Sequence, residues 1–374
     1  MMEMKRFFLL LVLGSILVAT GYVVGTLGLF QNTGNSGLLS PILPDPTPVP
    51  TPLNAFTIPA LREYQTVSSD LIIDDQVSET PNYKEFTFHF TTMGKRMSGL
   101  LTVPGDSAEV LVEKPAIVMV RGYVPPENYA PGIGTQPAAR YFASRGYTTL
   151  APDFFGFGTS DPEPTDEWEA RFIKPIAVIE LIHSLGERGI QAQGVNLAPN
   201  RPIGIWAHSN GGQIALTALE ITSVPIPTVL WAPVTAPFPY SVLFYGDETA
   251  DEGKQQRAWV ALFEKHYNAA EFSLTDYISD LAGPLQIHHG TADEAAPIAW
   301  SDEFTQKLQA ENERRAEIAD EDATATATAE ITSELTEPIS YNYYRYAGAD
   351  HNLRPIENWN QAVQRDVVFF GQEL

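Results

Sequence analysis

Residues 201–222 read RPIGIWAHSNGGQIALTALEIT, and this stretch decides the fold. An apolar run that predicts a short strand leads through Ser209 directly into a segment that predicts a helix. Small residues two positions before and after the serine, Ala207 and Gly211, allow a tight turn that lifts the hydroxyl above a sheet. The backbone N–H groups that begin the helix suit a developing oxyanion. The pattern predicts a nucleophilic serine, and a serine that only caps a helix is the alternative interpretation.

The chain from about Phe56 to Leu374 alternates apolar, strand-like runs with amphipathic segments. This alternation is typical of an α/β fold, with a mostly parallel central sheet and helices on both faces. Residues 84–104 alternate polar and apolar side chains around Met93-Gly94-Lys95 and predict an antiparallel hairpin. Later strands are expected at residues 116–120, 148–151, 203–206, 228–231, 285–287 and 339–346, and helices near 136–145, 165–188, 211–221, 255–268, 299–312 and 358–370.

Composition narrows the classes of function. The chain has 374 residues, with 46 acidic against 23 basic side chains and a formal net charge of -23. We therefore expect no nucleic-acid partner, because phosphate binding needs a basic face. The chain has no cysteine, which removes disulfides, thiolate nucleophiles and thiolate metal sites. Its chemistry must use oxygen and nitrogen side chains.

The first thirty residues predict a membrane segment. Lys5 and Arg6 precede an uncharged apolar run, Phe7–Phe30, which as a helix would span about 36 Å, enough to cross a bilayer. The positive flank favours a cytoplasmic N-terminus, with the remaining chain outside the cytoplasm. We expect residues 1–30 to be a transmembrane anchor. A signal peptide cleaved near Ala19-Thr20-Gly21, and hence a secreted protein, is the alternative interpretation.

A proline-rich linker, residues 31–58, is expected to follow the membrane segment. Prolines at alternate positions of Ser40–Pro52 predict an extended polyproline II spacer.

The main domain is then residues 59–374, and two stretches interrupt its alternation of strand-like and helical segments. Residues 235–283 are long, aromatic and partly helical, and we expect them to form a cap over a site. Residues 311–338 are acidic and of low complexity, and we expect a mobile surface insertion there.

A serine nucleophile needs a base and an acid that orients the base. Two later segments, LQIHHGTADEAAP at 285–297 and YAGADHNLRP at 346–355, each follow a predicted strand. They place Asp293 and His351 at the carboxyl edge of the sheet, where α/β proteins keep their sites. The order Ser209, then the aspartate, then the histidine is that of the α/β-hydrolase arrangement. These three residues are the predicted catalytic set.

Other titratable side chains near these segments have weaker cases. Asp350 and Glu294, each adjacent to a predicted catalytic residue, are alternative acids. His208 adjoins the serine but points differently along the turn, which favours a structural or pocket-wall role. His288 and His289 could be imagined as metal ligands, but consecutive residues of a strand face opposite ways. We therefore expect no metal site.

Residues from about 84 to 374 resemble an α/β-hydrolase, and specifically the catalytic domain of the prolyl oligopeptidase family and its dienelactone hydrolase and acetyl xylan esterase relatives. Several sequence blocks in the family's order carry the resemblance, and together they are far more specific than any one alone. The blocks are Val120-Arg121-Gly122-Tyr123, Ala151–Gly158 (APDFFGFG), the serine turn, His289-Gly290-Thr291-Ala292-Asp293 with Pro297, and Ala349-Asp350-His351.

The resemblance implies an α/β-hydrolase fold and a role for each site residue. Ser209 would be the nucleophile, and His351 the general base and then the general acid. Asp293 would orient the histidine and stabilise its charged form. The oxyanion hole would consist of the backbone N–H groups of Asn210 and Tyr123. No cofactor is implied.

The resemblance also implies acyl transfer through a serine acyl-enzyme, which serves esters, amides and peptides alike. The expected partner is a small-molecule ester or a short peptide. The chain leaves no room for the β-propeller that screens peptides in large family members, which favours a carboxylesterase over a serine-type peptidase. Phe154, Trp231 and Phe238 lie near the predicted sheet edge and are expected to line an apolar pocket, with core packing as the alternative.

A catalytically inactive hydrolase fold that serves as a surface binding module is the alternative function. Two departures from the family pattern favour it: Ala207 stands where a glycine is usual, and Arg121 stands where the relatives commonly have histidine. The second departure concerns the packing of the loop alone, because the expected oxyanion hole uses main-chain groups.

Overall fold

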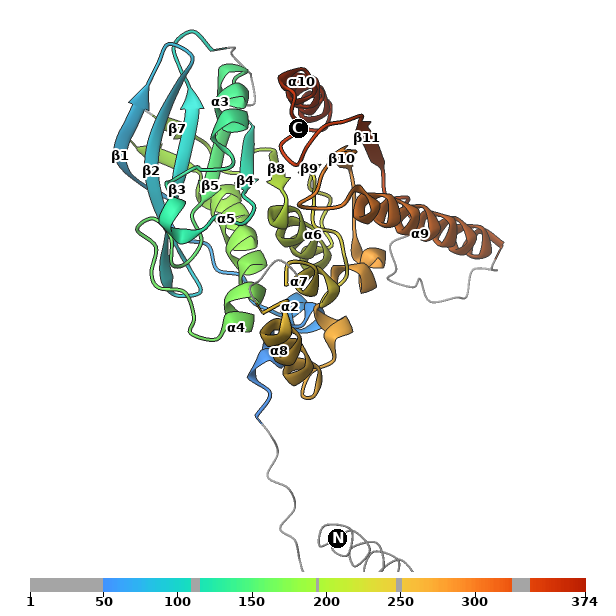
Figure 1. Ribbon diagram of the computed structural model, residues 1–374. Helices are drawn as coiled ribbons and strands as arrows, with labels where there is room; N and C mark the ends of the chain where they lie inside the picture. The colour runs from blue at the N-terminus through green and yellow to red at the C-terminus, as the bar shows by residue number, and fades with distance from the viewer. Residues whose placement is uncertain (1–49, 109–114, 193–194, 247–250, 325–336) are drawn as a thin grey trace, which may run out of the picture. The chain divides into compact units, whose positions relative to one another are not determined.

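The computed structural model describes residues 50–108, 115–192, 195–246, 251–324 and 337–374 (Figure 1). The predicted membrane segment, residues 1–30, and most of the predicted linker lie outside these ranges. Within the ranges, no helix is both long enough and apolar enough to cross a membrane. The domain begins at Thr51. Its first residues, Leu53 and Ile58, are buried, so the predicted linker ends earlier than residue 58.

One large sheet organises the described domain. Its strand order is β1-β2-β3-β5-β4-β8-β9-β10-β11. The pairs β1/β2, β2/β3 and β3/β5 are antiparallel, and the pairs from β5 onward are parallel, as predicted. The strands are β1 (Ile72–Glu79), β2 (Tyr83–Thr92), β3 (Lys95–Pro104), β4 (Ala116–Val120), β5 (Thr148–Pro152), β8 (Ile203–His208), β9 (Thr228–Trp231), β10 (Leu285–Gly290) and β11 (Tyr341–Tyr346), with a separate small pair β6 (Ile190–Ala192) and β7 (Val195–Leu197).

Helices lie on both faces of the sheet (Figure 1). Alternate residues of β4 face opposite layers because side chains of a strand alternate. Val118 and Val120 pack in a core with α5 and α6, whereas Ile117 and Met119 pack with α3 and α10. The helices are α2 (Ile58–Arg62), α3 (Gln136–Ser144), α4 (Glu167–Phe172), α5 (Lys174–Arg188), α6 (Asn210–Thr222), α7 (Tyr240–Phe244), α8 (Lys254–Glu264), α9 (Ile298–Thr324) and α10 (Ile356–Glu373).

The predicted hairpin is present and joins β2 to β3. Thr92 pairs with Lys95, which leaves Met93 and Gly94 as the two-residue turn. Both turn residues have positive φ angles, 49° and 71°, as the tight hairpin turns that match strand twist require. The edge strand β1 was not predicted, because its sequence, IIDDQVSE, is acidic and poor in strand-forming residues.

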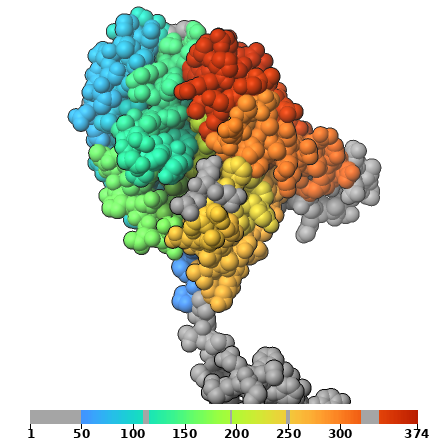
Figure 2. Space-filling model, in the orientation of Figure 1, coloured from blue at the N-terminus to red at the C-terminus, as the bar shows by residue number. Residues whose placement is uncertain are grey.

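The segment predicted as a cap, residues 235–283, contains α7, α8 and three short turns of 3₁₀ helix, Ala269–Phe272, Leu274–Asp276 and Ile278–Asp280. It packs against α4 through an aromatic cluster. Trp168 of α4 stacks on Trp259 of α8 with ring centroids 3.5 Å apart. In Figure 2 these segments, yellow and orange, form the lower part of the domain surface beside the green segments.

The stretch predicted as a mobile insertion, residues 311–338, is helical through Thr324, where α9 ends. Arg315 explains why this helical part is packed rather than mobile, because its guanidinium is buried inside the domain. It donates to the Glu311 carboxylate at 2.9 Å and to the backbone carbonyls of Ser279 and Leu281 at 3.0 and 2.9 Å. A buried arginine with its donors satisfied ties the helix to the chain that precedes β10. Residues 325–336 lie outside the described ranges.

Candidate active site

The serine turn joins β8 to α6 with a constrained backbone. Ser209 has φ 57° and ψ -125°, a region that costs a residue with a side chain about 1–3 kcal/mol. Three hydrogen bonds hold it there. Its N–H donates to the Trp231 carbonyl at 2.9 Å, and its own carbonyl accepts from Gly212 at 2.9 Å and from Val234 at 3.0 Å. Neighbouring main chain therefore supports the strained conformation.

Glycines let the main chain approach the serine closely. A Cβ at Gly211 would lie 2.1 Å from the carbonyl oxygen of Val120, so α6 begins directly against the end of β4. A Cβ at Gly122 would lie 2.8 Å from the Ser209 Cβ and 3.3 Å from its Oγ. Ala207, where the family pattern has glycine, is fully buried in the sheet core, so the domain accommodates its methyl group.

Two backbone N–H groups beside the serine have no hydrogen-bond acceptor among the described residues. They belong to Tyr123, in the loop after β4, and to Asn210, the first residue of α6. Both residues line the cavity that contains Ser209. An N–H at a helix start has no acceptor within its helix, so it is available to a ligand oxygen. These are the two groups that the family resemblance implies as an oxyanion hole.

Arg121 fixes the loop that carries Tyr123. Its buried guanidinium donates to the carbonyls of Gly122 at 3.0 Å and Asp153 at 2.8 Å. It also lies over the rings of Tyr129 and Phe157, 4.8 and 4.3 Å from their centroids. The arginine that departs from the family pattern is thus the side chain that packs the loop in place.

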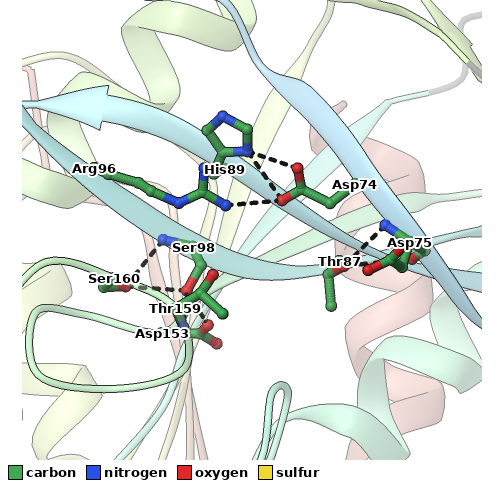
Figure 3. A network of polar contacts seen from close by, with 9 residues as sticks. All are labelled: Asp74, Asp75, Thr87, His89, Arg96, Ser98, Asp153, Thr159 and Ser160. Carbon is green, nitrogen blue, oxygen red and sulfur yellow. Dashed lines mark hydrogen bonds and ion pairs between the residues drawn. The ribbon is translucent and has the colours of Figure 1, made fainter.

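Asp153 extends this support in a buried polar network (Figure 3). Its carboxylate accepts hydrogen bonds from the Ser98 hydroxyl at 2.6 Å and from the Tyr129 hydroxyl. Ser98 in turn accepts from the N–H of Thr159 at 2.9 Å and donates its own N–H to Ser160 at 2.9 Å. Burial raises the pKa of Asp153 above its ordinary value. The network joins β3 to the loop after β5.

For the serine hydrolase reaction that the sequence predicts, replacing Gly122 with alanine should lower kcat/KM about 100-fold, because the added methyl would push the Tyr123 N–H away from the serine. Steady-state kinetics measure the loss, and the melting temperature shows whether the fold is intact. Gly186→Ala in α5 is the matched control, since a Cβ there meets no atom within 4 Å. Equal activity of the two variants would show that the close approach of Gly122 to Ser209 is unimportant.

Asp293 and His351, predicted as partners, are in contact. His351 Nδ1 lies 2.8 Å from Asp293 Oδ2, and its side chain is 20% exposed. The other carboxylate oxygen accepts from the N–H groups of Ala295 and Ala296 at 2.9 and 2.8 Å. Together these contacts fix the aspartate and leave Nε2 as the ring nitrogen of His351 without a hydrogen-bond partner among the described residues. His351 lines the same cavity as Ser209.

The charge of Asp293 is stabilised by its surroundings. Burial of the carboxyl would raise its pKa, but hydrogen bonds from His289 and His351 and from the Ala296 N–H outweigh burial, so the pKa falls below its ordinary value. His289 Nε2 lies 3.2 Å from the carboxylate, and its Nδ1 lies 2.7 Å from the Ser301 hydroxyl. The aspartate is therefore ionised at neutral pH.

The alternative acids are placed elsewhere. Asp350 accepts from the N–H groups of Asn352 and Arg354 at 2.9 and 2.8 Å, so it shapes the loop that carries His351. Glu294 is exposed, and no ion pair or hydrogen bond joins it to the described residues. Neither contacts His351 through a side-chain hydrogen bond.

His208 supports the same loop from the other side. Its Nε2 lies 2.9 Å from the backbone carbonyl of His351, a contact in which the imidazole N–H donates. Burial and the nearby His351 lower the pKa of His208 to about 4, so its ring is neutral at pH 7. His208 lines a second cavity of about 540 Å³, not the cavity that contains Ser209.

The cavity around Ser209 has a volume of about 760 Å³. Its walls come from the strained turn, the His351 loop, α4, α5, α6 and the segment predicted as a cap.

Residues 117–363 match the family model described as alpha/beta hydrolase family. The chain belongs to the alpha/beta hydrolase family. A comparison with curated protein sequences finds no match.

Solved structures share the fold of this α/β hydrolase. A puromycin-hydrolyzing peptidase of Mycobacterium tuberculosis is 17% identical with a TM-score of 0.52, covering 80% of this chain and 39% of that one. Acetyl xylan esterase 1 from Thermoanaerobacterium sp. JW/SL YS485 is 13% identical with a TM-score of 0.52, covering 85% and 93%. Dipeptidyl peptidase 4 of Porphyromonas gingivalis is 17% identical with a TM-score of 0.53, covering 78% and 36%. The chain thus spans well under half of each peptidase and nearly all of the esterase.

The three aromatic residues predicted to line the pocket of this α/β hydrolase do not line it. Phe154 is buried in the core under the Arg121 guanidinium. Trp231 faces the α3 and α10 layer, where its indole N–H donates to Asp366 at 2.9 Å. Phe238 packs inside the aromatic cluster of α4 and α8. The aromatic walls of the cavity come instead from Phe56, Trp168, Phe172, Trp259 and Phe272.

The sequence did not indicate a group of polar side chains in the cavity. Arg171 of α4, Lys174 of α5 and Gln213 of α6 line it, together with Glu163. Gln213 could have been found, because it follows Ser209 by one helical turn on the same helix. The two cations carried no such signal.

The two histidines considered as metal ligands have separate partners. His288 Nδ1 lies 2.8 Å from the Tyr346 hydroxyl, whereas His289 contacts Ser301 and the Ala296 carbonyl. Across the part of the chain that the structure describes, no group of three or more acidic or histidine side chains is arranged to hold a metal ion.

Proposed function

We propose that this α/β hydrolase is a serine hydrolase that cleaves esters of small molecules through an acyl-enzyme. Ser209 is the nucleophile, His351 the general base and Asp293 the acid that orients the base. One observation carries the proposal: a strained serine and an imidazole held by a buried carboxylate line the same cavity. Such strain is typical of functional sites.

The reaction would proceed in two acyl transfers. His351 Nε2 takes the proton of the Ser209 hydroxyl as Oγ attacks the ester carbonyl carbon. The imidazolium then gives this proton to the departing alkoxide, and the acyl group remains on the serine. Water attacks the acyl-enzyme with the same base and releases the carboxylic acid. Asp293 stabilises the imidazolium in both steps, since it is already ionised.

The negative charge of each tetrahedral intermediate develops on the former carbonyl oxygen. The N–H groups of Tyr123 and Asn210 would donate hydrogen bonds to it, and both lack other acceptors in the described domain. Preformed donors need no rearrangement when the charge develops, so they stabilise the transition state more than the ground state.

Esters of small molecules are favoured over peptides by two observations. The aromatic walls around the serine suit a compact apolar group more than an extended peptide backbone. The esterase neighbour is covered over 93% of its length, whereas the two peptidases are covered over 39% and 36%.

We also propose, from the sequence of residues 1–30, that the domain is anchored to a membrane and lies outside the cytoplasm.

Labelling with a fluorophosphonate probe tests the serine assignment. The wild-type chain should be labelled covalently on Ser209, and the Ser209→Ala variant should not be labelled. Peptide mapping of the labelled protein identifies the modified residue. Ser301, buried against His289, offers a matched control, and Ser301→Ala should keep the label. Equal labelling of wild type and Ser209→Ala would show that another residue is the nucleophile, and no labelling of either would favour the inactive binding module instead.

A further inference from the structure

The proposed reaction does not use Arg171, although its guanidinium lies in the cavity wall. Nη2 donates to the Gln213 side-chain oxygen at 2.6 Å. Nε is shielded from solvent and has no hydrogen-bond partner among the described residues. Burial lowers the pKa of Arg171 to about 10, so it remains charged at neutral pH. A shielded Nε–H donor on a cation is unfavourable without an acceptor, and a ligand would supply the missing one.

The acidic side chains around Arg171 do not neutralise it. Glu163 forms its ion pair with Lys174, at 3.5 Å. Glu167 precedes Arg171 by one turn of α4 but is exposed, and within the described ranges no carboxylate forms an ion pair with the arginine. The hydroxyl of Tyr245 is the group that favours its charge. Of these two cations, Lys174 alone has a carboxylate partner among the described residues.

Arg171 lies within reach of a substrate bound at the serine. Its partner Gln213 follows Ser209 by four residues on α6, a rise of about 6 Å along the helix axis. The guanidinium and Ser209 line one continuous cavity. Trp168 and Phe172, from the same helix as the arginine, also line this cavity. A short apolar spacer would therefore connect a group on Arg171 to a carbonyl at the serine.

We propose that Arg171 binds a carboxylate of the substrate, so that the natural substrates are anionic esters with the carboxylate a few bonds from the scissile carbonyl. This proposal rests on the proposed serine hydrolase function. Charge-assisted hydrogen bonds from arginine to carboxylate are strong, and they are stronger where water is excluded. The carboxylate could belong to the acyl part, as in half-esters of short dicarboxylic acids, or to the leaving group.

Two matched pairs of esters distinguish these sources. For the acyl side, 4-nitrophenyl hemiglutarate is compared with 4-nitrophenyl methyl glutarate, which has the same chain without the charge. For the leaving-group side, 4-acetoxybenzoate is compared with its methyl ester. In at least one pair the full-length wild-type chain should prefer the anionic ester, and Arg171→Gln should reduce that preference about 10- to 100-fold in kcat/KM. Hydrolysis of the neutral ester should change less than about threefold.

The control variants separate charge recognition from structural damage. Lys174→Gln removes the cation that already has a partner, so the preference should stay within about threefold of wild type. Arg171→Lys should retain part of the preference. If Arg171→Gln slows the anionic and neutral esters equally, its role is structural and the proposal is wrong. If wild type prefers the neutral ester in both pairs, the proposal is also wrong, while the serine hydrolase function stands.

A binding measurement keeps the two proposals distinguishable if catalysis is absent. Calorimetric titration of the Ser209→Ala variant with 4-nitrophenyl hemiglutarate and with the neutral ester needs no turnover. Tighter binding of the anionic ester, lost when Arg171→Gln is added, supports the carboxylate site even if fluorophosphonate labelling fails. Equal binding of the two esters, unchanged by Arg171→Gln, would overturn it.

Discussion

Replacing His351 with glutamine should lower kcat for 4-nitrophenyl acetate by about 10⁴- to 10⁶-fold. Among the described residues, His351 is the histidine that lines the cavity of Ser209, and its Nδ1 contacts the Asp293 carboxylate. Without it, the Ser209 hydroxyl has no base to accept its proton, and the leaving alkoxide has no acid. KM should change little, because glutamine fills a similar volume and the ring is partly exposed. Steady-state and burst-phase kinetics separate these effects.

His208 is the matched control for this prediction. The two rings lie with centroids 4.7 Å apart, so both histidines are candidates on proximity alone. His208 faces the other cavity, however, and donates to the His351 carbonyl. His208→Asn should therefore cost only about tenfold, by loosening the loop. A loss as large as that of His351→Gln would mean that the general base has been assigned to the wrong histidine.

The serine turn and its partners could be predicted because their signals are local. Small residues around Ser209, and short segments after strands for Asp293 and His351, each specify a position at the carboxyl edge of a parallel sheet. The neighbouring parallel strands β8, β9, β10 and β11 then bring these segments together. The N–H groups of Tyr123 and Asn210 were expected from the family resemblance, and the structure leaves both without a hydrogen-bond acceptor among the described residues.

The pocket could not be predicted in this way, because it depends on which face each side chain takes. Leu230 and Trp231 are neighbours in β9, yet they belong to cores on opposite faces of the sheet. Strand alternation would have separated them, but only the packed helices decide which face borders the cavity. Arg171 was missed for a different reason. A lone arginine in a short amphipathic helix carries no sign that its counter-ion is absent.

Replacing Asp293 with asparagine should lower kcat about 10⁴-fold while the fold is retained. The carboxylate accepts the Nδ1 proton of His351, which leaves Nε2 free to accept a proton from the serine. An amide that presents its NH₂ group to Nδ1 favours the opposite tautomer, with the proton on Nε2. Its oxygen can still accept from Ala295 and Ala296, so the turn should persist. Glu294→Gln, at the neighbouring exposed acid, should change kcat less than about threefold.

The pH dependence of stability gives an independent readout for Asp293. Its folded pKa lies below the ordinary value of 3.8, so the folded state stabilises the carboxylate. This stabilisation is complete above the unfolded pKa and is lost as pH falls through the folded pKa. The variant should therefore be less stable than wild type at pH 7, with a difference in unfolding free energy that shrinks below about pH 4. A difference that stays constant down to pH 2, in denaturant titrations, would mean that His289 and His351 do not stabilise this charge.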